Sequence, residues 1–297
     1  MTIDRLREVI NLKFYKRFTF AWKSIIIMMI DCSFPQVMGI LNITPDSFYQ
    51  GSRFTDPAAQ LRQVERMLSD GATIIDIGAV STRPGGKQAD EASELDRLLP
   101  AVRQISRHFP EAVISVDTYR SAVARAAVEE GASVINDIYG GRFDKEMIRT
   151  VAYLNVPFIL THMKGSPENM QDNPVYSDVV AEVNYFFEQQ TAHCREQGIR
   201  QVILDPGFGF GKTVAHNFTL LNHLDEISEL GFPVLAGISR KSMITKTLGC
   251  TPDEALNGTT VLNTLALVKG ANILRVHDVR EAVEAIRLFR ALYGEID

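Results

Sequence analysis

The chain has 297 residues, of which 45% are hydrophobic and 23% are charged, and its formal net charge is -5. This length can bury a large core and is usual for a βα barrel built as one domain. The acidic balance argues against a nucleic-acid-binding surface or a polybasic membrane patch, so a few local cations would have to hold any anionic ligand. The three cysteines have no Cys-x-x-Cys spacing. They indicate neither a disulfide framework nor a zinc site, and they fit a reducing cytoplasm.

Residues 1–35 predict an N-terminal extension of the fold. Basic residues come before a short apolar run at residues 25–30, an order that resembles a signal peptide. The run is too short to span a membrane, which needs ~20 apolar residues, and no small-residue cleavage site follows it. We therefore expect a variable helix or arm, followed by a strand that covers the bottom of the fold. Met28, Met29 and Met38 leave the true start site open.

Residues 36–297 repeat one plan, in which an apolar run of strand length gives way to polar residues and then to a helical pattern. In the first helical pattern, Asp56 and Pro57 form the predicted cap and first turn, and Val64 and Met67 fall on one face. The apolar runs lie at residues 37–41, 74–77, 113–116, 134–135, 158–160, 202–204, 234–238 and 273–276.

Glycines mark the ends of the helical patterns. Gly71, Gly131 and Gly270 each suit the left-handed backbone position just past a helix, and Gly198 and Gly231 stand in similar positions. Strand, helix and glycine recur about eight times, which predicts a single-domain α/β fold, the (β/α)8 TIM barrel, over residues 36–297. A doubly wound open sheet remains the alternative, because periodicity alone does not show that the sheet closes.

Polar residues stand at or near the carboxyl end of nearly every predicted strand. In a barrel these ends share one face, where active sites lie, so the side chains should converge. Asp117 or Asn136 alone would more often be a helix cap or a loop-fixing side chain. Their recurrence favours a site instead. The residues are Asn42, Asp76, Asp117, Asn136, Asp137, His162, Asp205, Ser239, Lys241, Arg275 and His277.

The chemistry of these residues divides by charge. Asp117, Asn136 and Asp205 offer acceptors and one amide, which suits the edge of a flat, nitrogen-rich ring that carries several N–H donors. The cations Lys241, Arg275 and His277 come from the last two βα units, where barrels commonly hold phosphate. A loop at residues 82–86, Thr-Arg-Pro-Gly-Gly, adds a hydroxyl, a cation and flexible backbone at the rim. On its own, its arginine is explained equally well as a solvated loop charge.

A glycine-rich stretch at residues 206–213 resembles a nucleotide P-loop but does not match one. The first glycine of G-x-x-x-x-G-K-[ST] would have to stand at Pro206, and Lys212 stands where a dinucleotide motif needs its third glycine. We interpret the stretch as a βα loop that lets backbone approach a ligand, with Phe208 or Phe210 packing on a ring. A purely packing role for one of these phenylalanines is at least as well supported.

Eight motifs run in one order from about residue 37 to the end of the chain. They are Met-Gly-Ile-Leu-Asn-Ile-Thr-Pro-Asp-Ser-Phe at 38–48, Ser-Thr-Arg-Pro-Gly at 81–85, Ser-Val-Asp-Thr at 115–118, Asn-Asp at 136–137, His-Met at 162–163, Asp-Pro-Gly-Phe-Gly-Phe at 205–210, Ser-Arg-Lys-Ser at 239–242 and Arg-Val-His-Asp at 275–278. Together they resemble the dihydropteroate synthases, the pterin-binding TIM barrels of the bacterial folate pathway. Each motif alone would be a weak match.

This resemblance implies a transferase that condenses 6-hydroxymethyl-7,8-dihydropterin pyrophosphate with 4-aminobenzoate, giving 7,8-dihydropteroate and pyrophosphate with the help of Mg²⁺. It implies that the pterin is bound by Asp117, Asn136, Asp205, Lys241, Met163 and Phe210. It implies that pyrophosphate is bound by Arg275, His277 and Thr82, and that the metal is bound by Asn42. The residues implied for 4-aminobenzoate are Thr82, Arg83, Pro84, Phe48, Lys241 and Ser242. Lys241, Arg275, His277 and Asp46 are the expected catalytic residues. Dissociative cleavage of the pterin C–O bond would separate charge, which carboxylates on one side and cations on the other stabilise without a covalent nucleophile.

One loop departs from the family pattern. The family commonly continues from the phenylalanine with Ser-Asp-Gly-Gly, whereas here neutral Gln50 replaces the loop carboxylate. Asp46 is the candidate substitute, and Asp46→Asn should then lower turnover sharply, while an unaffected rate would exclude it. The chain has no insertion beside residues 82–86, so a sulfonamide should compete with 4-aminobenzoate. The family also implies a homodimer, and the charge and cysteine content of the chain predict a cytoplasmic protein that binds neither membrane nor nucleic acid.

Two other functions remain open. A methyltransferase barrel that moves a methyl group from methyltetrahydrofolate to a corrinoid would share the pterin carboxylates. It would not need the Ser-Arg-Lys, Arg-Val-His or Thr-Arg-Pro-Gly motifs, all of which are present. A catalytically silent, pterin-binding paralogue is supported only by Gln50. Asn42, Arg275 and His277 oppose it, because a silent module has no use for a metal and pyrophosphate site.

Overall fold

The structure, a computed structural model, describes residues 29–43, 56–79, 90–167, 169–170 and 172–294. Eight parallel strands form one sheet in the order β6-β5-β4-β3-β2-β1-β8-β7. Their bounds are β1 Gln36–Asn42, β2 Ile74–Gly78, β3 Val113–Asp117, β4 Val134–Asp137, β5 Phe158–Thr161, β6 Val202–Asp205, β7 Leu235–Ala236 and β8 Ile273–Val276.

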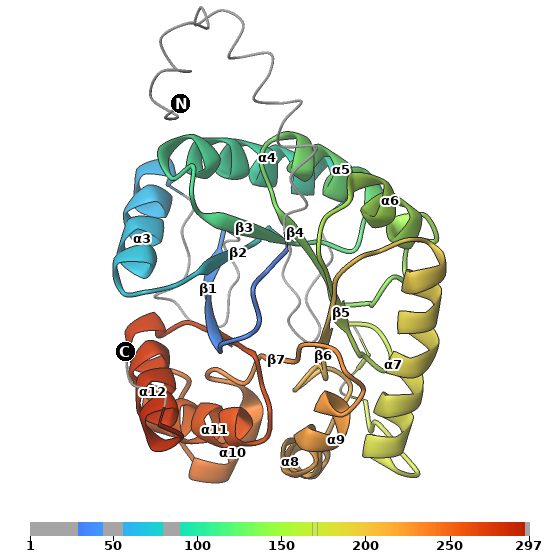
Figure 1. The fold of residues 1–297 in the computed structure, drawn as a ribbon, viewed down its shortest axis with the longest axis vertical. Helices are drawn as coiled ribbons and strands as arrows, with labels where there is room; N and C mark the ends of the chain where they lie inside the picture. Colours follow the sequence, from blue (N-terminus) through green and yellow to red (C-terminus); the bar gives the residue numbers. More distant parts are fainter. Residues whose placement is uncertain (1–28, 44–55, 80–89, 168, 171, 295–297) are drawn as a thin grey trace, which may run out of the picture.

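The sheet closes on itself, which confirms the predicted TIM barrel. β1 pairs with β2 on one side and with β8 on the other. A parallel bridge between Leu204 and Val234 joins β6 to β7, and Leu204 N–H donates to the carbonyl oxygen of Pro233 at 2.8 Å. Figure 1 shows the strands in the middle of the molecule and the helices around them. The doubly wound alternative is therefore excluded.

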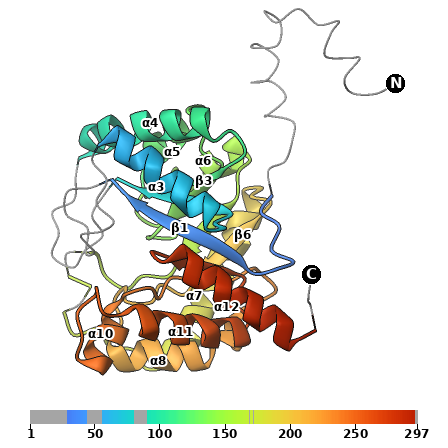
Figure 2. The ribbon, with the colours of Figure 1, turned by 90° about the vertical axis from the view of Figure 1, so that its left-hand side faces the viewer.

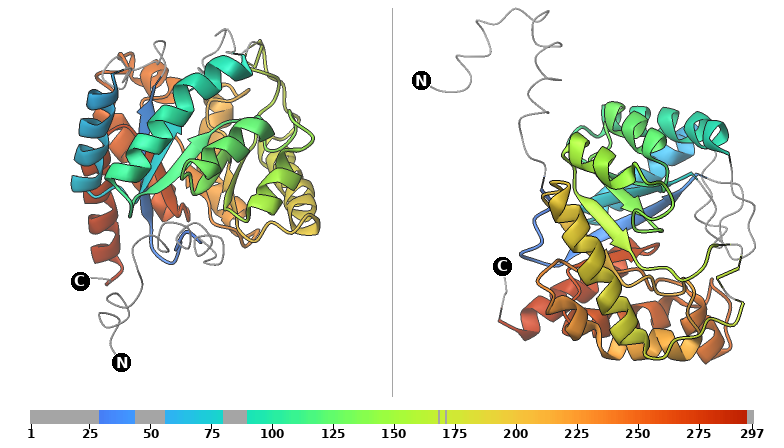
Figure 3. Two further views of the ribbon diagram at one scale, coloured as in Figure 1. Left: turned by 90° about the horizontal axis from the view of Figure 1, so that it is seen from above. Right: turned by 90° about the vertical axis from the view of Figure 1, so that its right-hand side faces the viewer.

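The helices form the outer layer, as the two views in Figure 3 show. Asp56 caps α3 as predicted, because its side chain accepts a hydrogen bond from the Ala59 N–H. α3 and the C-terminal helix α12 both pack against β1, which Figure 2 shows between them. The helix bounds are α3 Pro57–Ser69, α4 Glu91–His108, α5 Ser121–Glu129, α6 Met147–Leu154, α7 Val179–Glu196, α8 Val214–Asn222, α9 Leu224–Ser228, α10 Ser242–Leu248, α11 Leu256–Val268 and α12 Val279–Leu292.

The glycines that follow the helices have the predicted left-handed backbone. The φ angles are 101° at Gly71, 116° at Gly131 and 93° at Gly270. A residue with a Cβ is strained at such angles, so glycine lets the chain turn from each helix directly into the next strand. These sharp returns bring every strand into the barrel in parallel.

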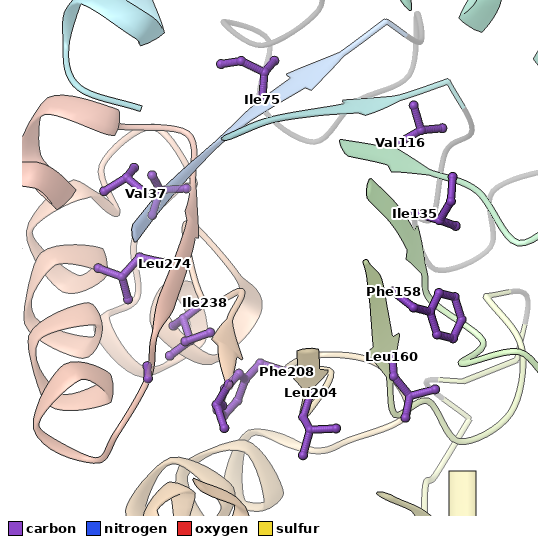
Figure 4. Packing of buried hydrophobic residues seen from close by; sticks show 14 of the residues in the cluster. Val37, Ile75, Val116, Ile135, Phe158, Leu160, Leu204, Phe208, Ile238 and Leu274 are labelled. Atoms are coloured by element: carbon purple, nitrogen blue, oxygen red, sulfur yellow. The ribbon is translucent and has the colours of Figure 1, made fainter. Parts of the chain in front are cut away.

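Side chains alternate between the two faces of the strands. Those facing outward, such as Ile75, Phe158 and Leu204, fill the space between barrel and helices (Figure 4). Those facing inward near the bottom form an apolar plug of Met38, Ile74, Val134, Ile159, Ile203, Leu235 and Ile273. Two residues further along, five of these strands carry polar inward residues, which are Asp76, Asn136, Thr161, Asp205 and Arg275. The barrel is thus sealed below, and its polar groups are gathered above the seal.

The described part of the N-terminal extension lies under this plug. Ile30 packs into it, and the Gln201 side chain exchanges two hydrogen bonds of 2.8 Å with the Ile30 backbone. Residues 29–35 are irregular, and most of the apolar run at residues 25–30, which is expected to form the bottom-covering strand, lies outside the described residues. A side-chain amide that satisfies the Ile30 backbone replaces the backbone pairing that a strand would have supplied.

Candidate active site

The predicted site residues that the structure describes lie at or beside the carboxyl ends of the strands. They are Asn42 on β1, Asp117 on β3, Asn136 on β4, Met163 after β5, Asp205 on β6 with Phe210 in the loop after it, Lys241 and Ser242 at the start of α10, and Arg275 and His277 at the end of β8. Asp46, Phe48, Thr82, Arg83 and Pro84 lie outside the described residues, as does Gln50.

An ion pair between Asp76 on β2 and Arg275 on β8 forms the centre of the polar layer. Arg275 Nε and Nη2 lie 2.7 and 2.6 Å from Asp76 Oδ2. Ser115 Oγ donates to the other carboxylate oxygen at 2.6 Å, and Asn136 Nδ2 donates to Oδ2 at 3.2 Å. Arg275 Nη2 also reaches Asp117 Oδ2 at 3.4 Å. Fully buried Asp76 therefore orients both the arginine and the amide of the site.

Asp76 is a site residue that the family resemblance did not assign. It lies two residues before the end of β2, in the sequence Ile-Ile-Asp-Ile-Gly. A lone acid inside an apolar strand is an available signal, because a buried carboxylate needs a charged or hydrogen-bonding partner. The identity of that partner was not readable, because Arg275 follows 199 positions later.

Gly78 lets two polar side chains approach each other at the mouth of the barrel. It ends β2 and pairs with Asn42 on β1 and Asp117 on β3. A Cβ atom at this position would lie 3.3 Å from Asn42 Oδ1 and 3.9 Å from Asp117 Oδ2. On the neighbouring strand, the buried Oδ1 of Asn136 makes no hydrogen bond with the described residues. This oxygen could accept a hydrogen bond from a bound molecule.

Asp205 and Lys241 approach each other beside the loop that follows β6. The Gly207 N–H donates to Asp205 Oδ1 at 2.8 Å, and Lys241 Nζ donates to the carbonyl oxygen of Phe208. The same ammonium lies 4.7 Å from the centroid of the Phe210 ring, a cation–π contact. The loop backbone and one aromatic ring therefore fix where the positive charge of Lys241 lies.

The two phenylalanines of this loop have different roles. Phe208 is fully buried among the residues between the strands and helices, as Figure 4 shows, so it is a packing residue. Phe210 is half-buried and packs against an apolar cluster at the rim. That cluster includes Met163, so the structure brings together the two side chains predicted to line the pterin slot. Its buried members are Tyr119, Ile138, Tyr139, Met163 and Met170.

Two charged residues of the motifs hold loops rather than face the site. Arg240 forms a bidentate pair with Asp278, with Nε–Oδ2 and Nη2–Oδ1 distances of 2.9 and 2.8 Å. This pair ties the loop after β7 to the loop after β8, where Ser239 Oγ lies 3.0 Å from His277 Nδ1. Asp137 accepts the N–H groups of two residues in the turn after β4, each at 2.8 Å.

Burial changes the ionisation of the site. It raises the pKa of Asp117 to about 7 although Arg275 opposes the shift, and it lowers the pKa of Lys241 to about 8 although Asp205 opposes it. Burial also lowers the pKa of His277 to about 3, which favours the neutral imidazole over the predicted cation. For Arg275, burial acts to lower the pKa, but the neighbouring carboxylates outweigh it and the pKa is raised.

The described oxygen ligands of the site are too few to hold Mg²⁺ without further ligands from water or substrate. In the described segments, no three His, Cys, Asp or Glu side chains form a group that could hold a metal ion. Mg²⁺ usually keeps several waters and binds one or two protein oxygens together with substrate phosphates. Asn42 Oδ1, beside Asp117 at the barrel mouth, is a hard oxygen donor of this kind. These residues therefore fit an ion that arrives with a phosphorylated substrate.

The chain matches the model of one protein family and resembles named enzymes along most of its length. Residues 38–277 match the family described as pterin-binding enzymes. The dihydropteroate synthase of Escherichia coli strain K12 is 44% identical over 264 residues, which cover 88% of this chain and 93% of that protein. Among the described residues, no helix has both the length and the apolar character needed to cross a membrane.

Solved structures give the same result. A dihydropteroate synthase of Yersinia pestis in complex with a sulfonamide drug has a TM-score of 0.86 and 42% sequence identity, covering 90% of this chain and 97% of that chain. A dihydropteroate synthase of Xanthomonas albilineans with 4-aminobenzoic acid has a TM-score of 0.81 and 41% identity, covering 89% and 94%.

Proposed function

Because the chain belongs to the dihydropteroate synthases, transferases of the pterin-binding enzyme family, we propose that it condenses 6-hydroxymethyl-7,8-dihydropterin pyrophosphate with 4-aminobenzoate. The products are 7,8-dihydropteroate and pyrophosphate. The carbon–oxygen bond at the pterin methylene breaks, and pyrophosphate leaves with the bonding electron pair. The amine of 4-aminobenzoate then donates its lone pair to that carbon and loses a proton.

The observation that carries this proposal is the row of acceptors on β3, β4 and β6. Asp117 and Asn136 lie at the ends of the neighbouring strands β3 and β4, and Asp205 ends β6, which β5 separates from β4. All three lie above the apolar plug. Asn136 Oδ1 makes no hydrogen bond with the described residues. A pterin edge presents several N–H groups in one plane, and these three acceptors are buried, where a hydrogen bond is electrostatically stronger than in water. The same acceptors stabilise the positive charge that the ring takes up as the C–O bond breaks.

Arg275 and His277 are proposed to hold the pyrophosphate. Arg275 stays protonated because the nearby carboxylates raise its pKa. It is 16% exposed in its side chain, so it faces both the buried Asp76 and the barrel mouth. His277 is neutral and bonded to Ser239, and an approaching anion favours its protonation. Both residues then offset the negative charge that grows on the leaving group.

Lys241 is proposed to lie between the two substrates. Its ammonium is held by the Phe208 carbonyl oxygen and the Phe210 ring, and Ser242 follows it at the start of α10. The remaining proposed contacts to pyrophosphate and 4-aminobenzoate come from Thr82, Arg83, Pro84 and Phe48, with Asp46 as a catalytic candidate. All five lie outside the described residues.

Asn42 is the residue proposed to hold Mg²⁺ together with the pyrophosphate oxygens. When bound, the ion supplies positive charge that stabilises the departing pyrophosphate. The chain's own cations at Arg275 and Lys241 act on the same charge from the protein side.

The chain is proposed to form a homodimer, supported by the exposed apolar stripe of Val261, Leu265 and Val268 on α11 and by exposed Leu288 and Leu292 on α12. It is also proposed to work in the cytoplasm, which is supported by three cysteines that are all free thiols.

The function is tested by supplying the purified chain with the substrates and measuring the dihydropteroate formed by mass spectrometry. The variant Asp205→Asn is measured beside it. The proposal predicts product only when both substrates and Mg²⁺ are present, and far less product from the variant. Pterin binding without any product would instead identify a silent paralogue. Transfer of a methyl group from methyltetrahydrofolate would identify a methyltransferase.

A further inference from the structure

Lys212, the lysine of the P-loop-like stretch, turns its side chain into the protein and is only 2% exposed. Its Nζ lies 3.1 Å from the carbonyl oxygens of His162, Gly207 and Phe210, and 2.9 Å from His162 Nδ1. Four acceptors around one nitrogen suit an ammonium with three N–H donors, whereas the lone pair of a neutral amine would face an oxygen. Lys212 is thus fully engaged inside the protein and has no N–H group left for a phosphate.

We propose that Lys212 is a positioning residue for the pterin site: its buried ammonium ties the loop after β6 to the end of β5 and balances the charge of Asp205. The proposal rests on the proposed function, because Asp205 and Lys241 are the pterin-binding residues that it positions.

The mechanical link runs through Gly207. Its carbonyl oxygen accepts from Lys212, and its N–H donates to Asp205 Oδ1 at 2.8 Å. The carbonyl oxygen of the next residue, Phe208, accepts from Lys241. A Cβ on Gly207 would lie only 1.9 Å from the His162 carbonyl oxygen, so the loop lies directly against the end of β5. Removing the ammonium would leave three carbonyl groups facing one another and would release the peptide that orients Asp205.

The electrostatic link follows from the charges buried in the site. Arg275 forms ion pairs with Asp76 and Asp117, and Lys241 is the cation that acts most strongly on Asp205. Burial raises the pKa of Asp205, and Lys241, Arg275 and Lys212 each oppose this shift. His162 adds no charge, because burial lowers its pKa well below the ordinary value.

Burial lowers the pKa of Lys212 well below its ordinary value, and Asp205 opposes this shift. The charged form is supported by geometry, because four acceptors surround the Lys212 nitrogen and suit an ammonium. Loss of Lys212 would therefore raise the pKa of Asp205 further. Because Asp205 must be ionised to accept pterin N–H groups, pterin binding would then require a higher pH.

The test is calorimetric titration of the full-length chain with 6-hydroxymethyl-7,8-dihydropterin pyrophosphate and Mg²⁺ over the acidic and neutral range. Lys212→Met removes the charge and the hydrogen bonds, and Lys212→Gln removes the charge but keeps amide donors. Lys164→Met is the matched control, since Lys164 in the loop after β5 forms a half-exposed pair with Glu182 on α7. Thermal melts establish that each variant is folded.

For Lys212→Met we expect affinity about tenfold lower at neutral pH or weaker still, with the acidic limb of the affinity profile moved to higher pH. Lys212→Gln should show the same movement with a smaller loss, and Lys164→Met should match wild type. The proposal would be overturned if both Lys212 variants bound the pterin with wild-type affinity or if both were unfolded. It would also be overturned if their loss of affinity were the same at every pH. If wild type itself binds no pterin, the proposed function fails instead.

Discussion

Asp76→Asn is the substitution that most directly probes how the site is held together. The change keeps the shape of the side chain but removes the charge that faces Arg275 Nε and Nη2 at 2.7 and 2.6 Å. An asparagine can still accept from Arg275 with its oxygen, and its amide can donate to Ser115 Oγ. The hydrogen bonds therefore persist, but their acceptor no longer carries a negative charge, so each is weaker.

The expected loss of unfolding free energy is about 2 kcal/mol. Hydrogen bonds to charged groups contribute about 1.5–3 kcal/mol and neutral ones about 0.5–1.5 kcal/mol, so two arginine contacts lose about 1 kcal/mol each. The ~3–5 kcal/mol typical of a broken buried ion pair is not reached, because Asp117 remains 3.4 Å from the guanidinium. The melting temperature should fall by about 4–8 °C.

The assay combines urea unfolding with steady-state kinetics. We expect kcat/KM for the pterin pyrophosphate to fall about tenfold or more, since the carboxylate charge that holds Arg275 and Asn136 in place is removed. Asp225→Asn is the control, because it removes an exposed pair of 3.0 Å with Lys269 and should change stability by less than about 0.5 kcal/mol. Stability and kcat/KM that match this control would refute the claim that Asp76 organises the site.

Three further predictions follow from the same geometry. The kcat/KM profile should rise through about pH 7 as Asp117 ionises and fall through about pH 8 as Lys241 loses its proton; in Lys241→Arg the upper limb should disappear, and a limb that stays would assign it to another group. Gly78→Ala puts a methyl group 3.3 Å from Asn42 Oδ1, so half-maximal activity should need several-fold more Mg²⁺, and an unchanged requirement would argue against Asn42 as a metal ligand. Leu265→Glu places a charge in the exposed stripe of α11 and should shift sedimentation from dimer to monomer, whereas an unchanged sedimentation coefficient would place any dimer interface elsewhere.

The fold could be predicted because its signals are local. Each strand is an apolar run of a few residues, and the glycine after a helix fixes a sharp turn at one position, as at Gly71 and Gly131. Closure of the sheet was not predictable in the same way. It depends on pairing of β1 with β8 and on the bridge between Leu204 and Val234, and no local pattern reports such contacts between distant segments.

The site was predictable only to the level of residue type and strand end. Asp117, Asn136 and Asp205 do lie at the ends of their strands, since the period of two that buries the plug also turns these residues inward. The protonation state of His277 depends on burial, which the sequence does not display. Lys212 illustrates the same limit, because its motif could be rejected as a phosphate loop, but its inward direction required the three-dimensional arrangement.

The central claim is tested most directly by pyrophosphate release from the dihydropterin pyrophosphate in the presence of Mg²⁺, with and without 4-aminobenzoate. The proposed function predicts release that requires 4-aminobenzoate and equals the dihydropteroate formed, mole for mole. Tight binding of the pterin substrate with no release under either condition would contradict it.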